Sequence, residues 1–138
     1  MLSRPFDDQH LLRNRLETEA TNLILSQVKQ GRVGLVVSPV HRREIEAIPD
    51  VYERTALQTI CEQYAVTIAF DLQATRQRAE ALVALGFGVA DAAHAAFAER
   101  SSAALVSCDD RLLKKCFTHV RGIWCGNPVA YCEKEKLR

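Results

Sequence analysis

The sequence lacks the features that mark membrane, secreted or zinc-binding proteins. It contains no apolar run close to the roughly 18–20 residues that cross a bilayer. The first residues form no apolar signal-peptide segment, so we expect a cytoplasmic protein without a membrane partner. The 5 cysteines are odd in number and never spaced as C-x-x-C, which indicates reduced, mostly buried thiols rather than a disulfide framework or a zinc site.

An excess of charge of one sign is also absent. The 18 Lys and Arg residues and 17 Asp and Glu residues leave a formal net charge of +1, so any contact with nucleic acid has to come from local basic patches. No repeats, low-complexity tracts or linkers interrupt the chain. With 48% apolar and 25% charged residues, this composition predicts one globular domain over residues 1–138, with a polar C-terminal tail over 129–138.

Apolar runs alternate with amphipathic stretches along the chain. Apolar runs typical of strands occupy 33–37, 66–70 and 103–107, and the last of these has no alternation, as expected of a strand covered on both faces. Residues 122–125 are expected to form a final edge strand. Helical periodicity or capping predicts helices over about 10–30, 40–47, 51–64, 72–85, 89–100 and 111–116. This alternation predicts an α/β fold of three layers, a parallel sheet with helices on both faces.

No predicted strand precedes the first helix. The first strand of a doubly wound sheet is usually central, so its absence predicts a gap in the middle of the sheet. The strands at 33–37 and 103–107 then either pair directly or expose open edges. Because open edges promote association, we expect a homodimer or a larger assembly.

Three acids from distant parts of the chain are predicted to meet at one rim of the sheet. Glu44 and Asp109 each follow a predicted strand, and Asp91 opens a helix that begins at the same edge. Carboxylates held a few ångströms apart repel one another unless a cation neutralises them. Oxygen ligands without nearby His or Cys clusters suit Mg²⁺ or Mn²⁺, and such a site suits phosphodiester hydrolysis by metal-activated water.

Each of these residues also has an ordinary structural interpretation. Asp91 in a first helical turn is favourable to the helix dipole without any function. Asp109 or Asp110 can cap the helix that follows, and Glu44 can be a solvated helix residue. His94 can face the same ligand as Asp91 or be a half-buried packing residue. Candidates for contacts to RNA phosphates, with a solvated surface as the alternative, are Arg42, Arg43, Lys114 and Lys115.

Five short motifs occur in a fixed order along the chain. They are a run at 2–9, S-x(5)-E at 38–44, G-x-x-x-A-D-A-x-H at 86–94, Leu-Val-Ser-Cys-Asp-Asp at 105–110 and Gly-Asn-Pro-Val at 126–129. Together they resemble the PIN-domain nucleases, which include toxin ribonucleases of bacterial toxin–antitoxin pairs. The resemblance implies a parallel α/β sheet and a Mg²⁺- or Mn²⁺-dependent enzyme that cuts single-stranded RNA.

The resemblance also implies roles for single residues. Glu44, Asp91 and Asp109 match the catalytic, metal-binding acids of the family. Asp110 is a weaker accessory acid. Ser107 matches the small hydroxyl residue before the acid and is a candidate to orient water or phosphate. An antitoxin protein is a further partner that the resemblance implies.

The chain departs from the family at its start. Members begin with a strand that ends in Asp-Thr or Asp-Ser, and that Asp is a principal metal ligand. Asp7 and Asp8 belong to the run that follows it and do not match it. The resemblance therefore implies either a start further upstream or a shortened member with impaired activity, in which the metal can be absent.

Two other functions stay open on the sequence. A catalytically inactive PIN-like module would bind RNA or a partner protein, and its binding would not respond to a chelator. A phosphoacceptor signalling domain also uses Asp pairs at strand ends, but it needs a Lys after the last strand. Residues 123–127 offer none, which argues against that class.

Overall fold

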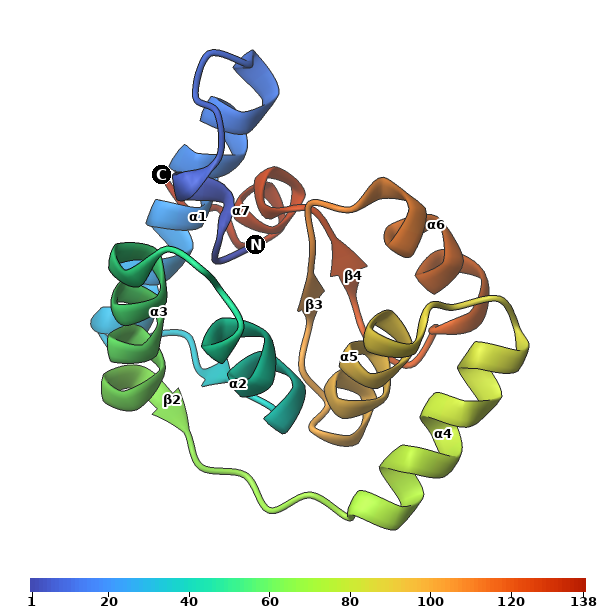
Figure 1. Cartoon of the computed structure of the whole chain (residues 1–138). Coiled ribbons are helices and arrows are strands. Elements are labelled where there is room, and N and C mark those ends of the chain that lie inside the picture. The colour runs from blue at the N-terminus through green and yellow to red at the C-terminus, as the bar shows by residue number, and fades with distance from the viewer.

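The computed structural model describes residues 1–138 and contains a 3-10 helix, seven α-helices and four short strands (Figure 1). In chain order the elements are the 3-10 helix Arg4–Phe6, α1 (Leu12–Lys29), β1 (Leu35–Val36), α2 (Pro39–Glu46), α3 (Val51–Tyr64), β2 (Ala65–Val66), α4 (Leu72–Ala84), α5 (Val89–Arg100), β3 (Leu105–Val106), α6 (Asp110–His119), β4 (Cys125–Gly126) and α7 (Pro128–Glu135). The alternation of strands and helices is confirmed, but helices dominate. None of the helices is both long and apolar enough to span a bilayer.

Polar caps fix where many of the helices begin. The side chain of Asp50 accepts a hydrogen bond from the Glu53 N–H at 2.8 Å, and that of Asn127 accepts one from the Ala130 N–H at 2.7 Å. Such caps satisfy backbone donors that the first turn of a helix leaves free. Further caps of this kind are Ser38, Asp71 and Asp109. These starts are local, which explains why the sequence predicts them closely.

The strands form two separate parallel pairs instead of one sheet. β1 pairs with β2 and β3 pairs with β4, and β1 does not pair with β3. The expected continuous sheet between two helical layers is therefore not shown by the structure. The strands expected at 33–37 and 103–107 do not pair directly, so each has a strand neighbour on one side only.

Each strand is also shorter than the sequence predicts. β2 ends at Val66, and residues 67–70 continue as irregular chain toward α4. Leu105 and Val106 of β3 are half-buried, whereas full burial was expected. A two-stranded unit gains little stability by itself. Each strand has a neighbour on one edge only and stays short; β1, β2 and β3 are incompletely buried, whereas both residues of β4 are buried.

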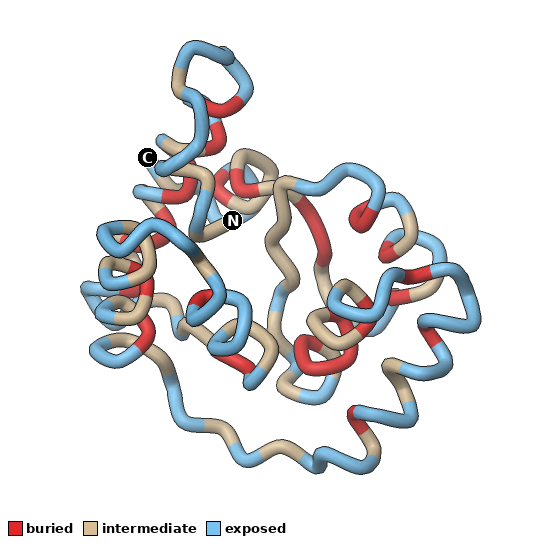
Figure 2. Tube along the Cα trace, in the orientation of Figure 1, coloured by how far each residue is buried: buried red, intermediate tan, exposed pale blue.

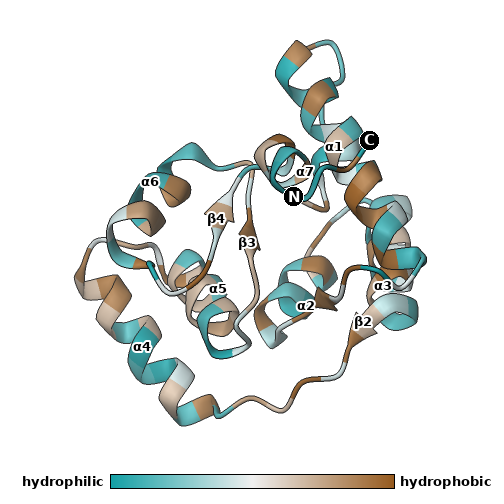
Figure 3. Cartoon of the chain, turned by 180° about the vertical axis from the view of Figure 1, so that it is seen from behind, coloured by the Kyte–Doolittle hydropathy of each residue, from teal (hydrophilic) through white to brown (hydrophobic).

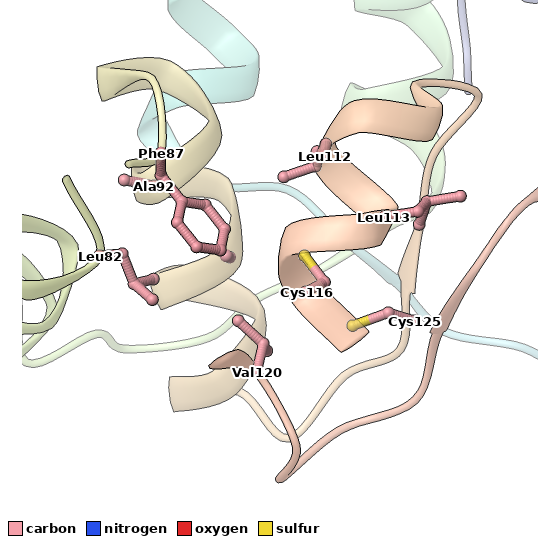
Figure 4. Close-up of a cluster of buried hydrophobic side chains, with 9 residues drawn as sticks. Leu82, Phe87, Ala92, Leu112, Leu113, Cys116, Val120 and Cys125 are labelled. Atoms are coloured by element: carbon pink, nitrogen blue, oxygen red, sulfur yellow. The ribbon is translucent and has the colours of Figure 1, made fainter. Parts of the chain in front are cut away.

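The core is divided in the same way as the sheet. The largest cluster is built from α4, α5, α6 and the segments beside them (Figure 4). It consists of Leu82, Phe87, Ala92, Ala95, Leu112, Leu113, Cys116, Val120 and Cys125. Because Ala92, Ala95 and Ala96 are fully buried, α5 lies close to α4, and this fits the small side chains on its inner face.

Two smaller clusters complete the core. One lies between α2 and α3 and contains Val37, Ile45, Leu57 and Cys61. The other joins α1 to α7 through Ala20, Ile24 and Cys132. The expected polar tail therefore begins as a helix that packs on α1. All 5 cysteines are free, and Cys108 is the one that is not buried. Figure 2 shows buried residues on the inward sides of the helices and exposed residues along the outer turns.

Leu82 provides a direct test of the main cluster. Its side chain is fully buried, whereas the neighbouring Val83 is 40% exposed. Leu82→Ala leaves a cavity and is expected to lower the free energy of unfolding by about 2–5 kcal/mol. Val83→Ala on the same helix is expected to change it by no more than about 0.5 kcal/mol. Urea unfolding followed by circular dichroism measures both, and equal losses would contradict this packing.

Candidate functional site

The carboxyl group of Asp91 is affected by the charges of Asp109 and Glu44, although the three residues belong to three different helices or their caps. Asp91 lies in the first turn of α5, Asp109 caps α6, and Glu44 lies on α2. Burial raises the pKa of Asp91 above its ordinary value, and the negative charges of Asp109 and Glu44 raise it further. The nearby positive groups of His94 and Lys115 oppose this rise. Asp91 thus lies near enough to Asp109 and Glu44 to be affected by their charges, but the three acids do not form a group that could hold a metal ion.

A chain of polar contacts leads from Glu44 across α5 and back to α2. His94 Nε2 lies 2.9 Å from Glu44 Oε1, a distance that fits donation by the imidazole to the carboxylate. The rings of His94 and His41 pack against each other in a tilted arrangement, with centroids 4.4 Å apart. His41 Nδ1 in turn accepts a hydrogen bond from the Ser38 backbone N–H at 3.1 Å. Burial lowers the pKa of His41 to about 4, with a smaller contribution from His94, so His41 is neutral at pH 7.

His94 is thus a half-buried residue with a definite partner. Its side chain is 13% exposed, and its Nδ1 atom is buried without any hydrogen-bond partner. His94 combines the two interpretations that the sequence left open, because it packs between α2 and α5 and also contacts the acid Glu44. The sequence analysis did not single out His41. Its position three residues after Ser38, as in a capping box, is the feature that could have identified it.

Asp109 is bound to its own helix. One carboxylate oxygen, Oδ1, accepts hydrogen bonds from the backbone N–H groups of Arg111 at 2.9 Å and Leu112 at 3.2 Å. Ser107 Oγ accepts one from the Asp109 N–H at 3.1 Å. Asp109 therefore caps α6, as the structural interpretation proposes, and Ser107 fixes the turn before it. The second oxygen of Asp109 makes no hydrogen bond within the chain.

Asp110 faces away from this group and toward α1. Arg13 binds both of its oxygens, at 2.6 and 2.8 Å, and this hydrogen bonding lowers the pKa of Asp110. Arg13 also donates to the Cys108 carbonyl at 3.2 Å and to Glu17 at 3.1 Å. A bidentate guanidinium contact of this kind fixes orientation as well as distance. The sequence analysis did not predict this role of Arg13. The adjacent acids Asp109 and Asp110 indicated only that some cation would lie nearby.

The basic candidates are divided between two places. Lys115 lies near Asp91 and donates to the Gly86 carbonyl at 2.7 Å. Arg42 lines a shallow hollow between α2 and α3 together with Gln58 and Glu62, so it does not belong to the acid group. Arg43 and Lys114 are exposed and make no side-chain hydrogen bond within the chain. Of the four, only Lys115 is brought to the acids.

The donor set fits a hard divalent cation in part. No group of three His, Cys, Asp or Glu side chains lies close enough together to hold a metal ion. Mg²⁺, however, keeps several waters and takes as few as one or two carboxylates. The side chain of Asp91 makes no hydrogen bond, and its pKa is raised first by burial and then by the charges of Asp109 and Glu44, which a cation would offset. Asp91 and the second oxygen of Asp109 are therefore the carboxylate groups left available for such an ion.

Comparison of the chain with models of protein families, with curated proteins and with solved structures gives no match in any of the three.

The repulsion at Asp91 has a consequence for stability. Because its pKa in the folded chain is raised, the folded state holds this proton more tightly than the unfolded state. Wild-type stability should then fall as pH rises from the ordinary pKa of Asp through the raised one. Asp91→Asn removes the charge, so its melting temperature relative to wild type should increase between pH 4 and pH 7. Thermal melts in matched buffers measure this, and a difference that is flat with pH would contradict it.

Proposed function

We propose that this chain is a PIN-like, Mg²⁺- or Mn²⁺-dependent ribonuclease that cleaves single-stranded RNA, with activity impaired by an incomplete set of acids. The observation that carries the proposal is the half-buried carboxylate of Asp91, whose pKa is raised by burial and by Asp109 and Glu44 from other segments. The motif order described for the sequence supports the same assignment. Clusters of acids with perturbed pKa values are typical of functional sites.

The residues of the chain then have separate tasks. Asp91 and Asp109 would hold the ion, and the ion would supply an activated water and offset charge that develops on the phosphate. Lys115, held by the Gly86 carbonyl, adds a positive charge beside Asp91 for an RNA phosphate. Ser107 keeps Asp109 oriented through its hydrogen bond to the Asp109 N–H. Glu44 is engaged by His94, which leaves only one of its oxygens for a further contact.

A second function is favoured because two of the acids are already hydrogen-bonded within the chain. Glu44 is hydrogen-bonded to His94, Asp109 caps α6, and no three potential ligands gather. A site in this state suits a PIN-like module that binds RNA or a partner protein, such as an antitoxin, without cutting. The two proposals differ in one property, since cleavage requires the divalent ion and simple binding does not.

Cleavage of a fluorescent single-stranded RNA in Mn²⁺ tests the first proposal. We expect slow cleavage that stops in EDTA and falls at least about a hundredfold in Asp91→Asn and in Asp109→Asn, because each removes a metal-binding carboxylate. Asn caps helices as well as Asp does, so Asp109→Asn should keep α6 intact.

Asp71→Asn is the matched control, because Asp71 caps α4 in the same manner and lies outside the acid group. It should retain the wild-type rate. Binding of Mn²⁺ by the wild type and not by Asp91→Asn, measured by electron paramagnetic resonance, separates a metal site from a contaminating nuclease. RNA binding that is unaffected by EDTA, with no cleavage, would favour the binding module. Cleavage that survives both substitutions would exclude this site.

A further inference from the structure

The first half of α1 presents leucines to solvent and polar residues to the protein. Leu12 and Leu16 are 62% and 53% exposed, whereas Asn14 and Glu17 are buried. In Figure 1 this part of α1 projects beyond the rest of the molecule, and in Figure 3 hydrophobic segments continue along the projecting end. A surface helix ordinarily has the opposite arrangement, with its apolar stripe facing the core.

Hydrogen bonds on the inner side hold the helix in this orientation. Arg4, which lies outside α1, donates to the Asn14 side chain at 3.0 Å and forms an ion pair with Glu17 at 3.4 Å. Arg13 binds Asp110 at the start of α6. Rotating α1 to bury its leucines would break these contacts and separate Glu17, whose side chain is 3% exposed, from Arg4. The exposed leucines are therefore a stable feature of the folded chain.

A groove continues the apolar stripe toward the C-terminus. It lies between α1 and α7 with a volume of about 450 Å³, and its walls include Leu16, Leu23, Val129 and Leu137. Leu12 lies one turn before Leu16 and outside the groove. At 3.6 residues per turn, Leu12, Leu16 and Leu23 fall on one side of the helix. The surface therefore combines a projecting leucine with a recess of matching chemistry.

We propose that this surface binds a second copy of the same chain, with the two α1 helices antiparallel about a two-fold axis near Leu16 and Glu19. In that arrangement Leu12 of each copy lies against Leu23 and enters the groove of the other. An isologous contact of this kind requires a self-complementary surface, and the pairing of a projection with a recess provides one.

The charged residues beside the leucines are also arranged so that a two-fold axis would pair opposite charges. Arg15 and Glu19 are exposed on the flank of the stripe, and neither forms an ion pair or side-chain hydrogen bond within its own chain. Antiparallel helices centred near residue 17 place Arg15 of one copy opposite Glu19 of the other, twice in each dimer. Complementary charges at an interface set its register. The net charge of +1 adds little repulsion between copies.

Sedimentation equilibrium on the full chain tests the proposal. The wild type is expected to be a dimer, and Leu16→Glu should raise the dissociation constant at least about tenfold, or about 1.4 kcal/mol. Leu72→Glu is the matched control, because Leu72 is a 61% exposed leucine at the start of α4. It should leave the dimer intact. Circular dichroism melts confirm that both variants are folded.

A charge exchange tests the antiparallel register itself. Arg15→Glu alone should weaken the dimer by opposing two carboxylates across the axis, and Arg15→Glu combined with Glu19→Arg should restore it. A monomeric wild type at high concentration would overturn the proposal. So would a dimer that Leu16→Glu leaves intact, since association would then use another surface, such as the free edges of β1 and β3. Failure of the charge exchange to restore association would overturn the antiparallel arrangement.

Discussion

The contact between α2 and α5 is the constraint on which the candidate site depends. β1 and β3 belong to separate sheets, so no backbone ladder joins the two parts of the molecule that carry the acids. At this contact His94 lies within hydrogen-bonding distance of Glu44 and packs against the ring of His41. The Ser38 N–H, just after β1, donates to His41. Because Glu44 comes from one side and Asp91 and Asp109 from the other, the distance between the acids is set by a polar contact of a few side chains.

The features that suit the proposed ion site also lower the stability of the fold. A half-buried Asp91 close to the charges of Asp109 and Glu44 is unfavourable for the fold, and the proposed divalent ion would offset that cost. The buried His94 Nδ1 atom, which has no hydrogen-bond partner, is a second unfavourable group. In contrast, Asp110 is neutralised by Arg13 and serves to attach α6 to α1. Two adjacent acids, Asp109 and Asp110, therefore have different roles because their neighbours differ.

α1 connects these features to the outer surface. Asn14 and Glu17 on its inner side contact Arg4, and Arg13 binds Asp110, so the leucines of this part of the helix face outward. Arg13 thus acts twice, since it orients the helix and holds the turn that begins with Asp110. A substitution on the inner side of α1 would therefore alter both the contact with α6 and the orientation of the leucine surface, although these lie on opposite sides of the helix.

Local information in the sequence determined the helices, their caps and the alternation with strands, because caps such as Asp50 and Asn127 act within one turn. It also determined which acids follow β1 and β3 and open α5. The tertiary structure decided what no short segment specifies: the sheet is split, Glu44 is bound by His94, and Asp110 is bound by Arg13. These pairings join residues up to 97 positions apart, and no local periodicity encodes which distant partner a charged side chain meets.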